Sequence, residues 1–260
     1  MGEIIRVRNL SYDKYEELIL RRDALKKEAF HWDRSYVREF GDEILSVFQL
    51  KIECIKKKKT IEFCQAALNR GQAVDQQKLQ QYLLEEMKSF QEQLEQMVSD
   101  NEAAKEAGSV TELEALEIKK IYHRMVKMIH PDINPLMDKS EALQELWQRI
   151  ILAYNCNDLK MMQETEILVN KVLEELGNDA VEIEIPDLEE KMRELEEEIK
   201  HIIETDPYQY KFLLEDDTKV KEKKDALLEE KKSFEDYGKQ LDDILKDMME
   251  GGMGFIWKMD

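Results

Sequence analysis

The sequence predicts an all-α protein built from long helices. The 260-residue chain has only 9 glycines and 4 prolines, where average usage gives about 18 and 13, and no proline precedes Pro131. Apolar residues recur at intervals of three and four along most of the chain, which is the spacing of one helix face. Hydrophobic residues make up 42% of the chain, enough for a core despite 37% charged residues. We therefore expect elongated helical hairpins or coiled coils.

The N-terminal region, residues 1–107, is predicted to form a helical hairpin or coiled coil. Its first apolar stripe is interrupted once, by the polar Arg22, and consists of Tyr15, Leu18, Leu25, Ala29, Trp32 and Tyr36. The pattern restarts after Gly41 and stops at residues 69–71. A third segment ends in the polar residues 99–101 and has the stripe Leu83, Met87, Phe90, Leu94 and Met97. Such narrow stripes are typical of helical hairpins and coiled coils.

The C-terminal region, residues 179–260, is predicted to be an antiparallel helical hairpin followed by a tail. The first arm has the stripe Leu188, Met192, Leu195, Ile199 and Ile202. The second arm repeats every seven residues at Val220, Leu227, Phe234, Leu241 and Met248. Residues 205–208 contain a proline and predict a chain reversal between them. Lys224, Lys231 and Gly238 make the second seam imperfect, which leaves open that this arm packs against another part of the chain.

Two short segments alternate with a period of two residues, the spacing of a strand. They are residues 4–8, with two arginines on one side, and residues 180–185, with two glutamates on one side. Opposite charges on matching faces favour a small two-stranded ribbon. Two unpaired linkers explain the pattern equally well.

The central region, residues 108–178, contains a cluster of positive charge. The formal net charge of the chain is −19, yet residues 119–130 hold four cations and no acid. On a helix, Lys120, Arg124 and Lys127 form one basic stripe with His123 beside it. The opposite, apolar stripe consists of Ile118, Tyr122, Met125 and Ile129. A purely structural reading also stands, because cations near a helix C-terminus are favoured by the helix dipole.

The sequence His130-Pro131-Asp132 predicts the end of this basic helix. Proline restricts the residue before it and has no backbone N–H to donate, so the helix stops and the imidazole and carboxylate lie on a loop. Asp138, with Glu141 three residues later, predicts a capping-box start for the next helix. That helix has the stripe Leu143, Leu146, Ile150, Ala153 and Tyr154. We expect two antiparallel helices joined by about seven residues.

These residues resemble the J domain of DnaJ-type co-chaperones. The segment from Lys120 to Asp132 is similar to the end of that domain's second helix and its His-Pro-Asp loop, and the following stripe is similar to the inward face of its third helix. The resemblance covers about residues 117–156. The family's first helix is not recognisable before Thr111, and we hypothesise that Leu94, Met97 and Val98 fill its place.

The resemblance implies a partner and a role for each site residue. In the family, the basic second helix docks on a negative surface of a DnaK-type ATPase chaperone, and the loop promotes ATP hydrolysis. By resemblance, Lys120, His123, Arg124 and Lys127 would contact or steer that partner, and Asp132 would accept a bond from a partner arginine. His130 and Pro131 would hold the loop in shape. The alternative is a coiled-coil scaffold whose J-like fold no longer binds the partner.

Composition and motifs argue against several other classes of function. The negative charge disfavours binding to nucleic acid or an anionic membrane. No sequence motif indicates an enzyme, a cofactor or a metal site, because His123, His130 and Asp132 match no metal-binding spacing. Three cysteines without a paired spacing, and no apolar leader or span, predict a cytoplasmic protein. Client binding by the helical arms stays open. A homodimer also stays open, because a helical seam buries the same side chains whether it closes within one chain or between two.

Overall fold

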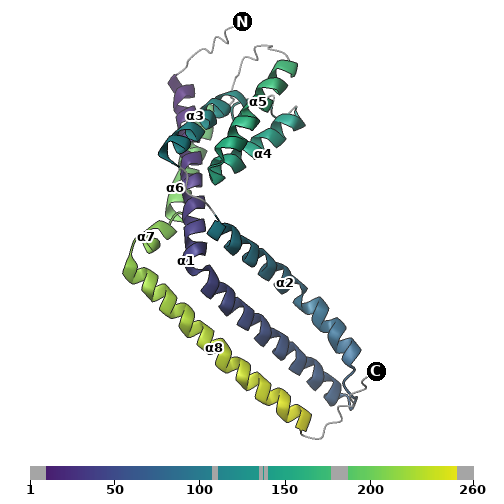
Figure 1. Ribbon diagram of the computed structural model, residues 1–260. Coiled ribbons are helices and arrows are strands. Elements are labelled where there is room, and N and C mark those ends of the chain that lie inside the picture. The colour runs from purple at the N-terminus through teal and green to yellow at the C-terminus, as the bar shows by residue number, and fades with distance from the viewer. Residues whose placement is uncertain (1–9, 107–110, 135–136, 138–139, 177–186, 251–260) are drawn as a thin grey trace. The chain divides into compact units, whose positions relative to one another are not determined.

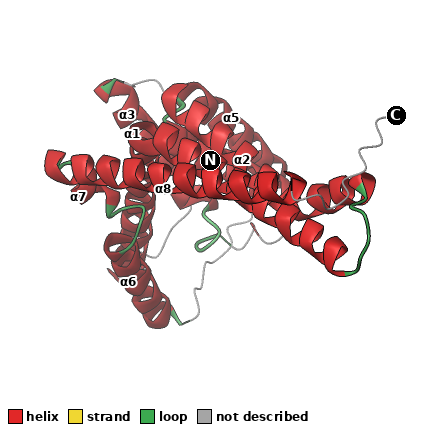
Figure 2. Cartoon of the chain, turned by 90° about the horizontal axis from the view of Figure 1, so that it is seen from below, coloured by secondary structure: helices red, strands yellow, loops and turns green. Residues whose placement is uncertain are grey.

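The computed structural model describes residues 10–106, 111–134, 137, 140–176 and 187–250. Within these residues there are eight helices and no strands, which confirms the all-α prediction. Figure 2 colours the helices red. Both segments of the predicted ribbon, residues 4–8 and 180–185, lie outside the described residues, and so does the tail after residue 250.

The helices vary widely in length. They are α1 (Leu10–Asn69), α2 (Gln76–Glu106), α3 (Glu112–Ile129), α4 (Glu141–Cys156), α5 (Leu159–Leu176), α6 (Leu188–Glu204), α7 (Tyr210–Leu214) and α8 (Asp217–Glu250), labelled in Figure 1. The longest, α1, has 60 residues and takes up the first two predicted helical segments in one element.

The chain forms two compact units, each assembled from two separated stretches of sequence. We call them the loop unit, the described residues of 1–34 and 107–211, and the long-helix unit, the described residues of 35–106 and 212–260. These two units differ from the three consecutive regions predicted from the sequence, which are residues 1–107, 108–178 and 179–260. The difference arises because the first part of α1 belongs to one unit and the rest of α1 belongs to the other.

The loop unit has a continuous hydrophobic core. Its centre consists of side chains with almost no exposed surface from α1, α3, α4 and α5, among them Ile19, Ile118, Met125, Ile150 and Met162. All predicted stripe residues of α3 and α4 belong to this core, together with the unpredicted Trp147. The predicted inward faces of these two helices are therefore confirmed.

The long-helix unit has a much thinner core. In Figure 1, α2 and α8 lie along opposite sides of the later part of α1. Two small clusters connect α8 to α1, one around Phe40, Val47 and Leu227 and one around Cys54, Ile61 and Leu241. Most other apolar side chains of these clusters are only partly buried. This unit therefore has the narrow seams that the sequence predicts.

Gly41 marks a close helix contact instead of a helix break. A Cβ atom at this position would lie 2.2 Å from the Oδ1 atom of Asn101 in α2. The Asn101 Nδ2 atom donates to Asp42, with a donor–acceptor distance of 2.8 Å. The predicted end of α2 at residues 99–101 is wrong. The helix continues to Glu106 because Asn101 and Ala104 are buried against α1, where Arg38 donates to the Ala104 carbonyl.

The two C-terminal arms bury their stripes against different stretches of α1 instead of against one another. Leu195 and Ile199 of α6 belong to the core of the loop unit, and Leu227 and Leu241 of α8 belong to the clusters of the long-helix unit. Gly238, one of the residues that interrupt the α8 seam, is buried and accepts a hydrogen bond from Lys57 of α1 through its carbonyl oxygen. The α8 seam therefore packs against α1, the option that its irregular positions left open.

Candidate functional site

Helix α3 carries the predicted basic stripe and begins with a complete capping box. The Thr111 hydroxyl accepts a hydrogen bond from the Glu114 backbone N–H, and the Glu114 carboxylate accepts one from the Thr111 backbone N–H at 2.9 Å. These bonds satisfy two donors that a helix N-terminus otherwise leaves unpaired. The bonds that the Glu114 carboxylate accepts from the Thr111 backbone N–H and hydroxyl lower the pKa of Glu114. The helix ends at Ile129, two residues before Pro131, as the restriction imposed by proline predicts.

The basic stripe is exposed, and two of its cations are paired within the loop unit. Arg124 donates to both carboxylate oxygens of Glu166 in α5, at 2.8 and 3.1 Å. The Lys127 Nζ atom lies 2.9 Å from a carboxylate oxygen of Glu16 in α1, whose side chain is mostly buried. Lys120 forms no ion pair within the described residues. The stripe thus combines one unpaired charge with two whose acids come from neighbouring helices.

His123 lies beside the stripe and is half-buried. Burial lowers the pKa of its imidazole, and the positive charges of Lys119 and Lys127 lower it further. The neutral ring is therefore favoured at neutral pH, so His123 adds little charge to the stripe there.

The His-Pro-Asp loop is organised around the buried ring of His130. Its Nδ1 atom accepts the backbone N–H of Asp132 at 3.0 Å, and its edge packs against the Trp147 ring with centroids 4.9 Å apart. The His130 carbonyl accepts the backbone N–H groups of Ile133 and Asn134, which closes a tight turn. Pro131 is exposed, and the side chain of Asp132 keeps 39% of its surface accessible. The loop therefore presents a carboxylate on a fixed backbone.

Two residues of α1 complete this loop, and neither was expected as a site residue from the sequence. Arg22 Nη1 lies 3.1 Å from the Asp132 carboxylate, and Arg22 also pairs with Asp23 at 2.9 Å. Asp23 is buried and accepts a hydrogen bond from the Tyr122 hydroxyl at 2.8 Å. The one available signal was Arg22 itself, the single polar residue in an otherwise apolar stripe.

The Nε2 atom of His130 has two polar neighbours from α1. It lies 3.2 Å from the Arg22 Nη2 atom, a group that can only donate a hydrogen bond. It also faces the Asp23 carboxylate at 3.7 Å. Burial alone would raise the pKa of Asp23, but the nearby His130 ring and the charge of Arg22 bring it below its usual value. The ionised Asp23 thus holds both the arginine and the imidazole in place.

The helix that packs against Tyr122 and Met125 in the core of the loop unit is α1. Tyr15, Leu18 and Ile19 belong to the core formed with Tyr122 and Met125. Our hypothesis that Leu94, Met97 and Val98 fill this place is wrong, because none of them is in that core and all three belong to the long-helix unit. The N-terminal turns of α1 have the wider run of large apolar residues that this core requires.

The cap of α4 also differs from the prediction. Ser140 is the N-cap residue, and its hydroxyl accepts the Leu143 backbone N–H at 3.3 Å. Because α4 begins at Glu141, the predicted cap at Asp138 was two residues too early, and the connection spans residues 130–140. The stretch between the loop and the cap includes Met137, which is buried in the core.

Lys27 lies above the aromatic residues of the core. Its Nζ atom is 3.9 Å from the centroid of the Tyr154 ring, which stacks on Tyr122 with centroids 3.8 Å apart. Burial, and the charge of Lys119 on α3, lower the pKa of Lys27 to about 8. Lys27 therefore loses its proton at a lower pH than an exposed lysine does.

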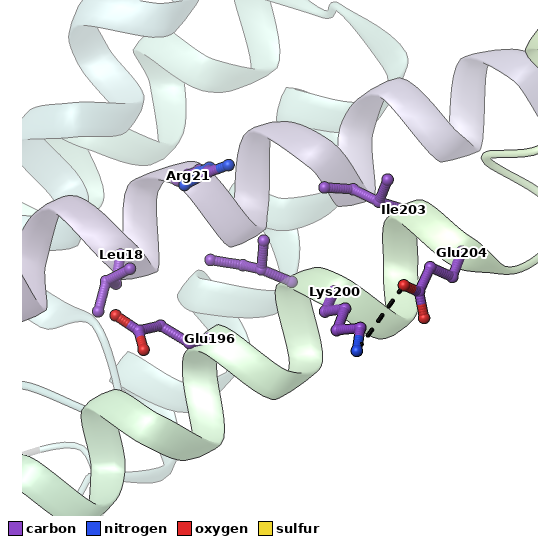
Figure 3. Close-up of a pocket in the computed structure, with 7 residues that line it drawn as sticks. Leu18, Arg21, Glu196, Lys200, Ile203 and Glu204 are labelled. Atoms are coloured by element: carbon purple, nitrogen blue, oxygen red, sulfur yellow. Dashed lines mark ion pairs between the residues drawn. The ribbon is translucent and has the colours of Figure 1, made fainter.

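A pocket between α1 and α6 carries no comparable chemistry. Figure 3 shows Leu18 and Arg21 from α1 facing residues of α6, with an ion pair between Lys200 and Glu204 at its edge. Among the described residues, no group of three or more His, Cys, Asp or Glu side chains is placed to hold a metal ion. No described helix has the length and apolarity needed to cross a membrane.

Comparisons with protein-family models, with curated proteins and with solved structures find no match to this chain.

Proposed function

We propose that this protein is a J-domain-like co-chaperone, which binds a DnaK-type ATPase chaperone through α3 and the His-Pro-Asp loop and stimulates its ATP hydrolysis. The observation that carries the proposal is the state of the loop. The buried His130 ring fixes the Asp132 backbone through Nδ1, and the Asp132 side chain stays partly exposed. A carboxylate held this way is suited to accept a charge-assisted bond from an arginine of a partner.

The exposed basic stripe supports the same proposal. Lys120, Arg124 and Lys127 are on the exposed face of the helix that leads directly into the loop. In a chain with a net charge of −19, such a face would steer association with a negative surface and would orient it. Neither the stripe nor the loop offers a reacting group, so the proposed role is binding and the hydrolysis is carried out by the partner.

A second candidate function is a scaffold whose J-like hairpin serves only for packing. The observation in its favour is that Asp132, Arg124 and Lys127 all have ion-pair partners inside the loop unit. In this reading, the long seams of α1, α2 and α8 carry the function by binding another protein. The scaffold predicts no effect on the ATPase.

Single-turnover ATP hydrolysis by a DnaK-type chaperone, with and without this protein, tests the proposal. We expect stimulation by the natural chain and loss of it in His130→Gln, because the glutamine amide would not reproduce the imidazole contacts that hold the loop. His201→Gln is the matched control, since His201 is exposed on α6 of the same unit.

The fluorescence of Trp147, which contacts His130, reports whether the His130→Gln variant keeps its core when Trp32 and Trp257 are replaced by phenylalanine. Stimulation that survives in a folded His130→Gln variant contradicts the proposal. The absence of stimulation at saturating concentrations of the natural chain favours the scaffold.

A further inference from the structure

Arg22 connects the loop to three carboxylates. Its side chain is only 12% exposed and lies between Asp23, Asp132 and Glu198. The contact with Asp132 joins two residues that are 110 positions apart in the sequence. An arginine of this chain therefore already occupies the carboxylate that the proposed function assigns to an arginine of the partner.

Resting on that proposed function, we propose that Arg22 is a specificity-determining residue of the loop: it holds Asp132 in cis and competes with the arginine of the partner. Binding then exchanges one guanidinium for another at the same carboxylate. Breaking the internal pair of Arg22 and Asp132 costs free energy. Only a partner surface with a well-placed arginine and further contacts recovers that free energy, so the loop discriminates between partners.

The surroundings of Arg22 make this exchange feasible. When Asp132 is released, Arg22 keeps the Asp23 carboxylate at 2.9 Å and has Glu198 at 3.6 Å. It is therefore not left as a buried charge without a partner, which is the costly outcome when a buried ion pair is broken. Asp132 is the more exposed of the two side chains, at 39% against 12%, so a partner reaches the carboxylate first.

The basic stripe is restrained in the same way by acids of the loop unit. Glu16 of α1 pairs with Lys127, and Glu166 of α5 pairs with Arg124. Arg22 and Glu16 both belong to α1, so one helix contacts both the anionic and the cationic parts of the proposed binding face. This arrangement places α1 as the element whose side chains a partner has to replace.

Binding to a DnaK-type chaperone in its ATP-bound state tests the competition. The equilibrium dissociation constant is measured for the natural full-length chain, Arg22→Met, Arg22→Lys, Asp132→Asn and the control Arg21→Met, an exposed neighbour that does not contact the loop. We expect Arg22→Met to bind about tenfold more tightly, since one charge-assisted bond no longer has to be displaced. Arg22→Lys should gain less, about threefold, because it keeps a charge but lacks the fork. Arg21→Met should match the natural chain.

The outcomes separate this inference from the proposed function. If the natural chain binds in a manner that requires Asp132, and folded Arg22→Met binds equally or more weakly, the competition is refuted and the proposed function stands. If neither chain binds, or if Asp132→Asn binds as well as the natural chain, the proposed function fails and the inference fails with it.

If Arg22→Met does not fold, Arg22→Lys decides the question. Tighter binding by this variant supports competition, and equal or weaker binding refutes it. Trp147 fluorescence checks the core of each variant, because this ring packs against the loop histidine.

Discussion

The loop unit and the long-helix unit use α1 in opposite ways. In the loop unit, the first part of α1 contributes Tyr15, Leu18 and Ile19 to a broad core and Arg22 and Asp23 to a buried polar network. In the long-helix unit, the rest of the same helix contacts α8 through two small clusters and surface ion pairs, and it contacts α2 closely at Gly41. One continuous helix thus serves both as part of a core and as a narrow seam, and the surrounding helices decide which.

The difference also affects how polar groups are used. Tyr122, Asp23 and His130 in the loop unit are buried and satisfy one another, so each depends on the others. In the long-helix unit, Lys57 with Asp242 and Lys224 with Glu39 are ion pairs at exposed edges. Exposed pairs of this kind contribute little to stability. We therefore expect the loop unit to tolerate substitution less well.

The largest expected effect is the loss of a core side chain from the loop unit. Ile150→Ala should lower the free energy of unfolding by about 2–5 kcal/mol, because it leaves a cavity in fully packed surroundings. Leu227→Ala, the matched change in the long-helix unit, should cost less, since its cluster has few fully buried members and can collapse more readily.

Two sets of probes distinguish these units in urea titrations. Trp147 fluorescence reports the loop unit in a background with Trp32→Phe and Trp257→Phe. Thiol labelling of the buried Cys54 and Cys64 reports the long-helix unit in a Cys156→Ser background that removes the exposed thiol. Equal losses of unfolding free energy in Ile150→Ala and Leu227→Ala would contradict the expected difference between the two units.

A smaller difference in stability is expected between alanine substitutions at Gly41 and Gly238, which both lie at helix contacts of the long-helix unit. Gly41→Ala should destabilise the protein by about 1–3 kcal/mol, because the new Cβ would overlap Oδ1 of Asn101 at 2.2 Å. Gly238→Ala should be neutral or stabilise by up to about 0.5–1 kcal/mol, since its Cβ would meet Cys54 Sγ at 3.6 Å and Lys57 Nζ at 3.8 Å, both ordinary contacts, and alanine favours the helix.

Thermal unfolding of both glycine variants provides the measurement. Adding Asn101→Ala to Gly41→Ala makes space for the new methyl group, so the double variant should lose less than the sum of the single losses. Strict additivity would show that the close approach of Asn101 is not what requires a glycine at position 41.

The smallest effect concerns the pH dependence that Lys27 gives to the loop unit. Its pKa is about 8 in the folded protein and about 10.4 in an unfolded chain. Between these values the unfolded state binds more protons, so stability rises as the pH increases. With allowance for solvent at this half-buried side chain, the rise amounts to about 1 kcal/mol or less.

Lys27→Met removes this contribution to the pH dependence. Urea unfolding followed by Trp147 fluorescence at pH 7 and pH 9.5 should show the natural chain gaining stability relative to the variant. Parallel changes in the two proteins would mean that the environment of Lys27 does not disfavour its charge.

Much of the local structure follows from the sequence alone. The apolar stripes of α3 and α4 are buried as predicted, because each helix is amphipathic enough for its own pattern to choose the inward face. Pro131 ends α3 through backbone geometry, which needs no tertiary partner. Helical structure throughout the described residues was equally predictable from the scarcity of glycine and proline.

Only the tertiary structure decided which stripes meet. Residues 90–98 and the first turns of α1 both offer apolar spacing that could complete the loop unit, and periodicity does not distinguish one partner from another. Gly41 is read from sequence as a break, whereas its role depends on Asn101 from another helix. The contact between Arg22 and Asp132 was invisible for the same reason, because residues 110 positions apart become neighbours only through the packing of α1 on the core.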